Sequence, residues 1–250
     1  MALTIDLAGQ VALVTGGTKG IGAAIADALA SAGALVVVCG RHEPASPAHA
    51  FRSCDVRDPE QVAGLVDAIV GEHGRLDIAV NNAGGSPRAD AADASPRFSE
   101  AIIRLNLLGP LHVAQAANRV MQRQSAGGAI VNVASVSGLR PSPGTAAYGA
   151  AKAGLLSLTQ SLAVEWAPKV RVNAVSAGLV ATEDSLEHYG GEAGLARVAA
   201  TVPAGRFADP AEVANAVAFL VSPMASYASG ANLVLHGGGE WPAFLRVAEA

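Results

Sequence analysis

The sequence predicts an α/β protein, folded as a single domain around a mostly parallel sheet of seven strands with helices on both faces. Hydrophobic residues make up 51% of the 250 residues and aromatic residues only 4%, so the core must consist of small aliphatic side chains. Short β-branched runs alternate with longer segments of helical period. Because no Pro/Ser-rich linker or internal repeat interrupts them, residues 1–250 are predicted to be one domain.

The predicted strands are short and almost uniformly apolar, which is typical of strands buried on both faces. In chain order they span residues 11–15, 35–39, 51–54, 78–80, 129–134, 170–175 and 232–236. Parallel strands need crossover connections, and segments of helical period lie between them. The predicted helices span residues 21–32, 59–73, 96–124, 147–166 and 210–221.

The connection from residue 41 to residue 50 breaks this pattern. Pro44 and Pro47 leave no room for a regular helix between the second and third strands. We therefore expect an irregular connection there.

Charge and composition exclude several classes of partner. The chain carries 17 Lys and Arg against 21 Asp and Glu, so no basic field is available to hold a nucleic acid. No apolar run approaches the roughly 18 residues of a membrane span, and the first residues lack the basic start of an export signal. Cys39 and Cys54 have no CxxC or His-rich surroundings, and no HExxH-type cluster occurs. We therefore expect a cytoplasmic protein without a metal, with both cysteines as small buried side chains.

The turn after the first predicted strand is the strongest functional signal. It reads TGGTKGIG over residues 15–22 and opens a helix. Glycines let a backbone approach a pyrophosphate closely, and a helix N-terminus attracts the anion. A glycine-rich turn alone could be merely structural, but its position between a strand and a helix indicates nucleotide binding.

The end of the second strand bears on which nucleotide is bound. A site for NAD usually places an acidic residue there to accept from the ribose 2′-hydroxyl, whereas this chain has Gly40 and Arg41. Arg41, helped by Lys19 of the glycine turn, could pair with a 2′-phosphate. The alternative is that both are solvated surface cations. We favour NADP(H) over NAD(H).

Four further polar residues indicate catalysis. Tyr148 and Lys152 share one helix face at i and i+4, a spacing that also occurs in ordinary surface helices. However, the strand 129–134 ends at Ser135, and Asn106 interrupts an otherwise apolar helical segment, where a buried amide needs partners.

With these residues in place, the chain resembles the classical short-chain dehydrogenase/reductase family over nearly its whole length. That resemblance implies a doubly wound, Rossmann-type fold and a catalytic tetrad of Asn106, Ser135, Tyr148 and Lys152. It also implies an adenine contact at Asp55 and nicotinamide carboxamide contacts at Val180 and Thr182. The cofactor-binding residues expected are Gly16, Thr18, Lys19, Gly20, Ile21, Gly22, Arg41, Asp55, Val56, Asn82, Ala83, Gly84, Tyr148, Lys152, Gly178, Val180 and Thr182. Ala177 stands where the family usually has proline, and the 41–50 connection lacks the usual helix.

The resemblance also implies a mechanism. In the reducing direction Tyr148 donates a proton to the substrate oxygen while hydride enters the carbonyl carbon, and oxidation reverses these steps. Tyrosine has a pKa near 10, and lowering it by about 3 requires roughly 4 kcal/mol. Lys152 and the positive ring of an oxidised nicotinamide are expected to supply this. Ser135 would orient the substrate oxygen, and Asn106 would hold a water that leads protons to Lys152.

Substrate choice is expected to depend on residues 183–203 and on the loop after Gly84. Gly190 and Gly191 suggest a small lid over the nicotinamide, and the alternative is a pair of surface helices. The lid segment also contains His188 and Tyr189. Two leucines in it hint at a partly hydrophobic substrate, and two arginines elsewhere could meet an acidic group, although we favour solvated roles for both arginines. These residues are Leu186, Leu195, Arg88 and Arg140.

The function predicted is that of an NADP(H)-dependent alcohol dehydrogenase or ketone reductase. Its small-molecule substrate would be a carbonyl or alcohol, such as a 3-oxoacyl thioester, a steroid-like ketone or a sugar. The alternative is a catalytically inactive nucleotide-binding regulator, against which the intact tetrad argues. The resemblance further implies a homotetramer, or a homodimer, built through the helices at 96–124 and 148–166 and the last strand. Trp241, Phe244 and Leu245 would be covered by a neighbour unless the tail folds back.

Overall fold

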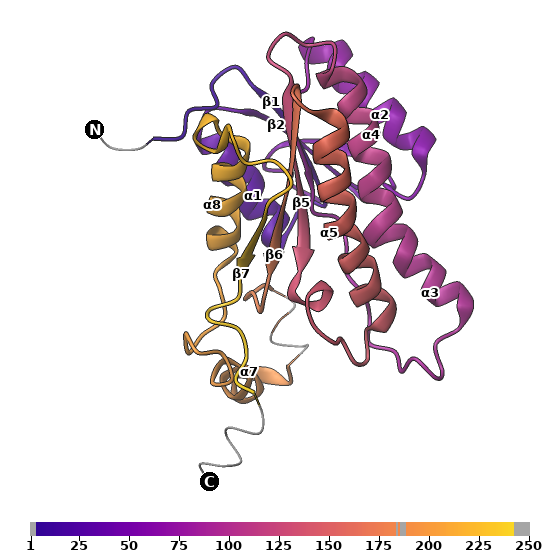
Figure 1. The fold of residues 1–250 in the computed structure, drawn as a ribbon, viewed down its shortest axis with the longest axis vertical. Helices are drawn as coiled ribbons and strands as arrows, with labels where there is room; N and C mark the ends of the chain where they lie inside the picture. The colour runs from indigo at the N-terminus through magenta and orange to yellow at the C-terminus, as the bar shows by residue number, and fades with distance from the viewer. Residues whose placement is uncertain (1–3, 184, 186–188, 243–250) are drawn as a thin grey trace.

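The computed structural model describes residues 4–183, 185 and 189–242. These residues form one twisted sheet of seven strands in the order β3-β2-β1-β4-β5-β6-β7, and every neighbouring pair is parallel. Helices cover both faces of the sheet (Figure 1). The doubly wound α/β fold predicted from the sequence is therefore confirmed.

All seven predicted strands form, most of them within one or two residues of the expected ends. They are β1 (Val11–Thr15), β2 (Leu35–Gly40), β3 (Ala50–Ser53), β4 (Ile78–Asn81), β5 (Gly128–Ser135), β6 (Val170–Ala177) and β7 (Asn232–Leu235). The chain builds outward from β1 to β3, then returns to the other side of β1 and continues from β4 to β7. The loops that follow β1 and β4 therefore diverge to opposite faces, which opens a crevice at the carboxyl ends of the strands.

Two hydrophobic cores hold the helices against the sheet. In β1, Ala12 and Val14 belong to the core on one face, whereas Val11 and Leu13 belong to the core on the other. This double burial explains why the strands are uniformly apolar. Helices α1 (Gly20–Ser31) and α8 (Pro210–Val221) pack on the first face. The other face carries α2 (Pro59–His73), α4 (Gly109–Met121) and α5 (Ala146–Trp166) (Figure 1).

The single helix predicted over 96–124 is wrong in its details. Helix α3 (Pro96–Ile103) runs into a π-helical turn at Arg104–Leu108 before α4 begins, and α4 ends at Met121. In the π turn the amide of Gly109 donates to the carbonyl of Arg104, five residues back. Pro110 has no amide hydrogen, so it cannot supply the α-helical hydrogen bond to the carbonyl of Asn106. The wider turn occurs where this bond is missing.

The two segments expected to be unusual differ from each other. The 41–50 connection contains no helix in the structure, as predicted. Within the predicted lid segment, α7 (Gly191–Ala199) begins directly after Gly190, and Gly190 and Gly191 have φ angles of 74° and 82°. Helix α7 lies beyond the arrowheads of β5 and β6 (Figure 1). The expected roles of Leu186 and His188 lie outside the described residues.

Among the helices that the structure describes, none has both the length and the hydropathy needed to cross a membrane.

Arg171 on β6 fastens the end of α8 to the sheet. Its Nη1 donates to the carbonyls of Leu220, Ala225 and Ala228 at 2.7, 3.0 and 3.3 Å. Its Nη2 donates to the carbonyls of Val221 and Ser222. A cation at a helix C-terminus also opposes the negative end of the helix dipole. One guanidinium therefore satisfies the last two carbonyls of α8, those of Leu220 and Val221.

Replacing Arg171 by methionine is expected to lower the free energy of unfolding by about 2–4 kcal/mol, because several part-buried carbonyls lose their donor. Urea denaturation of the purified variant measures this loss. Lys169→Met is the matched control, since Lys169 donates to the carbonyls of Gln122 and Gln124 from an exposed position and should cost less than about 1 kcal/mol. Equal losses in the two variants would contradict the role given to Arg171.

Candidate active site

A cavity of about 660 Å³ lies along the carboxyl ends of the strands. Every residue expected to bind a cofactor lines it, from the glycine turn after β1 to Val180 and Thr182 after β6. Ser135, Tyr148 and Lys152 line it as well, whereas Asn106 does not. The structure thus brings residues at or after the carboxyl ends of β1 to β6 together with residues of α1 and α5 in one pocket.

The glycine turn forms a cradle that excludes side chains. Gly16 and Gly20 have φ angles of 63° and 54°, which favour glycine. A Cβ atom on Gly22 would collide with the carbonyl oxygen of Gly16 and the side-chain nitrogen of Asn82. Helix α1 begins at Gly20 without an acidic residue or a side-chain cap in its first turn. The cradle and the uncapped amides fit the pyrophosphate of a dinucleotide.

Thr15 and Asn82 lock the loop after β1 to the loop after β4. The hydroxyl of Thr15 accepts from the backbone amides of Asn82 and Ala83, both at 3.0 Å, and donates to the carbonyl of Val80. The side-chain amide of Asn82 donates to the carbonyls of Thr15 and Gly16, also at 3.0 Å. These bonds fix the floor of the cradle at the point where the strand order reverses.

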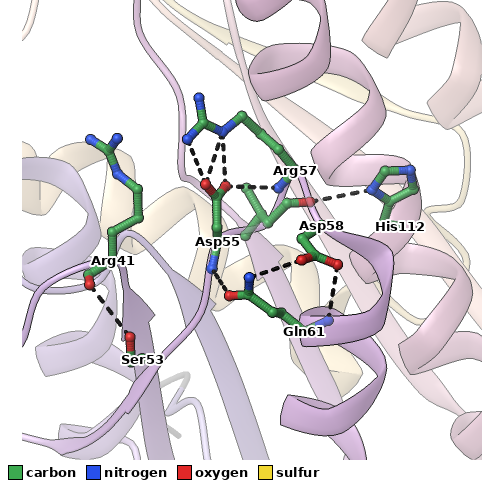
Figure 2. A network of polar contacts seen from close by, with 8 residues as sticks. Arg41, Ser53, Asp55, Arg57, Asp58, Gln61 and His112 are labelled. Atoms are coloured by element: carbon green, nitrogen blue, oxygen red, sulfur yellow. Dashed lines mark hydrogen bonds and ion pairs between the residues drawn. The ribbon is translucent and has the colours of Figure 1, made fainter.

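The far end of the cavity carries charged residues that follow β2 and β3 (Figure 2). The carboxylate of Asp55 accepts from Nε of Arg57 at 2.9 and 3.1 Å, and this contact holds the pKa of Asp55 below its usual range. The backbone amide of Asp55 donates to Oε1 of Gln61. Arg41 lies on the other side of Asp55. Arg57 was not predicted as a site residue, although its position two residues after Asp55 could have indicated a local ion pair.

Tyr148 and Ser135 face each other at the other end of the cavity. Burial raises the pKa of the Tyr148 phenol, and its hydrogen bond with Ser135 opposes that rise. Ser135 is itself oriented because its hydroxyl accepts from the backbone amide of Ser137 at 3.1 Å. Burial is the larger of these two effects, so the pKa of Tyr148 is raised overall.

Lys152 is a buried cation directly beneath Tyr148. Its ammonium lies 5.6 Å from the centre of the Tyr148 ring and donates to the carbonyl of Val133 at 2.8 Å. Burial lowers the pKa of Lys152 from 10.5 to about 8. At pH 7 the side chain is thus still mostly protonated, although the surrounding protein disfavours the charge.

Asn106 lies behind the cavity wall. Its side-chain oxygen accepts from the amide of Gly85, and its side-chain nitrogen donates to the carbonyls of Gly85 and Ile102. A Cβ atom on Gly84 would lie 2.7 Å from Oδ1 of Asn106 and 3.4 Å from Nζ of Lys152, so Gly84 separates the two side chains. The Asn106 side chain is thus engaged with Gly85 and Ile102, and its backbone carbonyl lacks the α-helical donor that Pro110 cannot supply.

The remaining residues suggested for substrate recognition have other contacts. Arg140 forms an ion pair with Glu240 at 2.6 Å, and neither Arg140 nor Arg88 lines the cavity. Leu195 lies on α7, outside the cavity lining. Ser185 and Tyr189 do line it, and the Tyr189 ring packs edge-on against Phe207 with 5.3 Å between ring centres. Ser185 belongs to the predicted lid segment 183–203 but was not singled out as a cavity residue.

Across the part of the chain that the structure describes, no group of three or more His, Cys, Asp or Glu residues is placed to hold a metal ion.

Comparison with known proteins yields matches over nearly the whole chain. A family model described as enoyl-(acyl carrier protein) reductase matches residues 16–240. A D-threitol dehydrogenase of Mycolicibacterium smegmatis is 38% identical over 244 residues, covering 93% of each chain. A 3-oxoacyl-[acyl-carrier-protein] reductase of Vibrio cholerae is 38% identical over 243 residues, covering 94% of this chain and 98% of the other. The ligand-free structure of an aldohexose dehydrogenase from Thermoplasma acidophilum superposes with a TM-score of 0.90 at 32% identity, covering 94% and 96% of the two chains.

The buried charge of Lys152 should destabilise the ligand-free protein. With a pKa of about 8 in the folded chain and 10.5 when unfolded, the unfolded state binds more protons between these values, so this group's contribution to stability rises with pH across that window. Below pH 8 the cost is about 3 kcal/mol, offset in part by the hydrogen bond to Val133.

Lys152→Met is therefore expected to raise the free energy of unfolding at pH 7 by about 1–3 kcal/mol, with the gain shrinking between pH 8 and pH 10. Urea denaturation of both ligand-free proteins at several pH values measures this difference. Lys169→Met serves as the control for an exposed lysine and should show no such dependence. A gain that does not change with pH would rule out the buried charge as its cause.

Proposed function

Because this chain belongs to the short-chain dehydrogenase/reductase family and transfers hydride between a nicotinamide cofactor and an alcohol or carbonyl group, we propose that Asn106, Ser135, Tyr148 and Lys152 are its catalytic residues and that it prefers NADP(H). The observation that carries this proposal is that Ser135, Tyr148 and Lys152 line the same cavity as the glycine cradle. A cofactor held in that cradle can therefore reach the phenol.

The residues present fit a dinucleotide along the whole cavity. Gly16, Gly20 and Gly22 allow the tight turn that would hold a pyrophosphate, since a Cβ atom on Gly22 would collide with the carbonyl oxygen of Gly16. The carboxyl ends of β2 and β3 would hold the adenosine half, with Asp55 and Val56 at the adenine, and Thr18, Ile21, Asn82, Ala83 and Gly84 would line its path. Gly178, Val180 and Thr182 would hold the nicotinamide half. The bound cofactor would supply the hydride, carried on C4 of its nicotinamide.

Tyr148 acts as the acid in carbonyl reduction and as the base in alcohol oxidation. Its hydroxyl donates a proton to the substrate oxygen as that oxygen gains negative charge, and Ser135 donates a second hydrogen bond to the same oxygen. Lys152, held by Val133 beneath the Tyr148 ring, places a positive charge where the phenolate forms. This charge lowers the free energy of the deprotonated tyrosine relative to the neutral one.

Asn106 supplies the return path for the proton. Its backbone carbonyl lacks the helical donor that Pro110 cannot provide, which leaves it able to bind a water. The Asn106 side chain meanwhile fixes the loop at Gly85. We propose that Lys152 exchanges protons with solvent through this water.

The substrate proposed is a small secondary alcohol or ketone. The names of the relatives support sugars and polyols as well as 3-oxoacyl thioesters. The ion pair between Arg140 and Glu240 argues against Arg140 as a partner for an acidic carrier. Residues 183–203 are proposed to act as a lid, with Ser185 and Tyr189 on its inner side.

The preference for NADP(H) is proposed from charge at the adenosine end. Arg41 and Lys19 line the cavity, and no acidic residue ends β2 to accept from a ribose 2′-hydroxyl. Both cations can reach a 2′-phosphate that extends from a dinucleotide held in the cradle.

Assembly and location are also inferred. Val164 on α5 and Phe219 on α8 are 81% and 39% exposed, and Trp241 is 54% exposed, which supports burial by neighbouring subunits of a homotetramer or homodimer. The two cysteines in the described chain are free thiols, which supports a cytoplasmic location.

Tyr148→Phe removes the proposed proton donor and should lower kcat by about 10²–10⁴-fold, while the Kd of NADPH changes by less than about threefold. The substrate for this assay comes from a turnover screen with polyols, sugars, steroid-like ketones and 3-oxoacyl thioesters. Tyr227→Phe is the matched control, because Tyr227 is fully exposed and away from the cavity. Wild-type kcat in Tyr148→Phe would contradict the proposed mechanism.

Arg41→Ala should raise the Kd of NADPH by about 10–100-fold and that of NADH by less than about threefold, since a phosphate loses a charge-assisted hydrogen bond. Fluorescence titration with the two reduced cofactors gives both constants. Arg52→Ala is the control, because Arg52 pairs with Glu72 outside the cavity. Similar losses for NADPH and NADH would refute a phosphate contact at Arg41.

A further inference from the structure

Arg57 binds both oxygens of the Asp55 carboxylate through its backbone amide and its guanidinium. Oδ1 of Asp55 accepts from the backbone amide of Arg57 at 3.0 Å and from its Nε at 2.9 Å. Oδ2 accepts from Nε at 3.1 Å and from Nη2. The Asp55 side chain is 25% exposed and that of Arg57 35% exposed, and both line the cavity. A carboxylate at the adenosine end is thus neutralised by its own chain neighbour.

The backbone around this pair is held in place from two sides (Figure 2). Gln61 accepts from the amide of Asp55 at 3.0 Å and donates to Asp58, whose carboxylate caps the first turn of α2. On the other side, Nδ1 of His112 on α4 lies 3.3 Å from the carbonyl of Val56. The arrangement of Asp55 and Arg57 is therefore fixed by α2 and α4.

Arg41, which directly follows β2, lies beside the same carboxylate (Figure 2). Its positive charge contributes to lowering the pKa of Asp55, so the two side chains interact electrostatically. Its backbone carbonyl accepts from the hydroxyl of Ser53 at 3.4 Å. Within residues 4–183, 185 and 189–242, no hydrogen bond or ion pair engages the Arg41 guanidinium. The Arg57 guanidinium is thus already paired with Asp55, whereas the Arg41 guanidinium is available to bind a phosphate.

Without Arg57, this balance would change in two ways that both disfavour a 2′-phosphate. The unpaired carboxylate of Asp55 would attract Arg41 and become a competitor of the phosphate for its guanidinium. The same carboxylate would also repel the phosphate directly. The affinity for a cofactor with a free 2′-hydroxyl would change little by either effect.

We infer that Arg57 is a specificity-determining residue for 2′-phosphorylated cofactors, which acts by holding Asp55 away from Arg41 and cancelling its charge. This inference rests on the proposed preference for NADP(H) and assigns part of that preference to a residue that need not touch the phosphate. Arg57 is accordingly a positioning residue, and Arg41 is the one that makes the contact.

The test uses two probes that differ only by the 2′-phosphate, 2′,5′-ADP and 5′-AMP, titrated calorimetrically into the ligand-free protein. Arg57→Met is expected to weaken 2′,5′-ADP by about 5–20-fold and 5′-AMP by less than about threefold. Asp55→Asn/Arg57→Met, which removes both charges, should return the ratio of the two Kd values to within about threefold of wild type. Arg52→Met removes a cation of β3 outside the cavity and should leave the ratio unchanged.

Adding Arg41→Ala to the Asp55→Asn/Arg57→Met variant separates an indirect effect from a direct contact. With the Asp55 carboxylate removed, an Arg57 that acts only through Asp55 and Arg41 leaves the triple variant with the same ratio of Kd values as Asp55→Asn/Arg41→Ala. A further loss in the triple variant would mean that Arg57 binds the phosphate itself, which overturns the indirect role. Circular dichroism and thermal denaturation check that each variant is folded, and the partial exposure of the pair predicts little change in Tm.

Failure of the inference and failure of the proposed preference give different results. If wild type binds 2′,5′-ADP no more tightly than 5′-AMP, the proposed preference for NADP(H) is wrong and the inference falls with it. If wild type prefers 2′,5′-ADP and Arg57→Met keeps that preference within twofold, only the inference about Arg57 is overturned. Restoration by the Asp55→Asn/Arg57→Met variant supports it.

Discussion

The joint between the loops after β1 and β4 is the constraint on which the rest of the site depends. Thr15 binds two backbone amides of the neighbouring loop, and Asn82 returns two hydrogen bonds to the glycine turn. The strand order reverses at this point, so without the joint the two halves of the cavity would be free to separate. Gly22 is then required because Asn82 and Gly16 occupy the space that any side chain would need.

The end of the cavity that holds the proposed catalytic residues shows a different kind of constraint. Lys152 is buried there, and its ammonium donates to the carbonyl of Val133. A neutral side chain would suit this position better in the folded protein, whereas a cation can stabilise a phenolate nearby. Active sites commonly retain such locally unfavourable groups.

Most of the fold and much of the candidate site could be predicted from the sequence because their signals are local. Uniformly apolar runs identify the strands, Pro44 and Pro47 exclude a helix, and the glycine turn follows its strand directly. The π turn at Arg104–Leu108 was missed because Pro110, in the middle of the predicted helix 96–124, signals a missing hydrogen bond but not whether the helix ends, kinks or widens there. The Asp55–Arg57 pair was missed because charged residues near a turn are usually solvated. The raised pKa of Tyr148 depends on burial, which spacing along a helix does not report.

The irregular 41–50 connection lies at the proposed adenosine end of the cavity, far from the proposed catalytic residues, and this location favours engineering. It leaves β3 as a short, largely exposed edge strand and leaves the adenosine end bounded by side chains rather than by a helix. The proposed catalytic residues that line the cavity lie on β5 and α5, several strands away across the sheet. Because surface loops tolerate insertions, this connection can be lengthened or redesigned to accept other nucleotides without changing those residues.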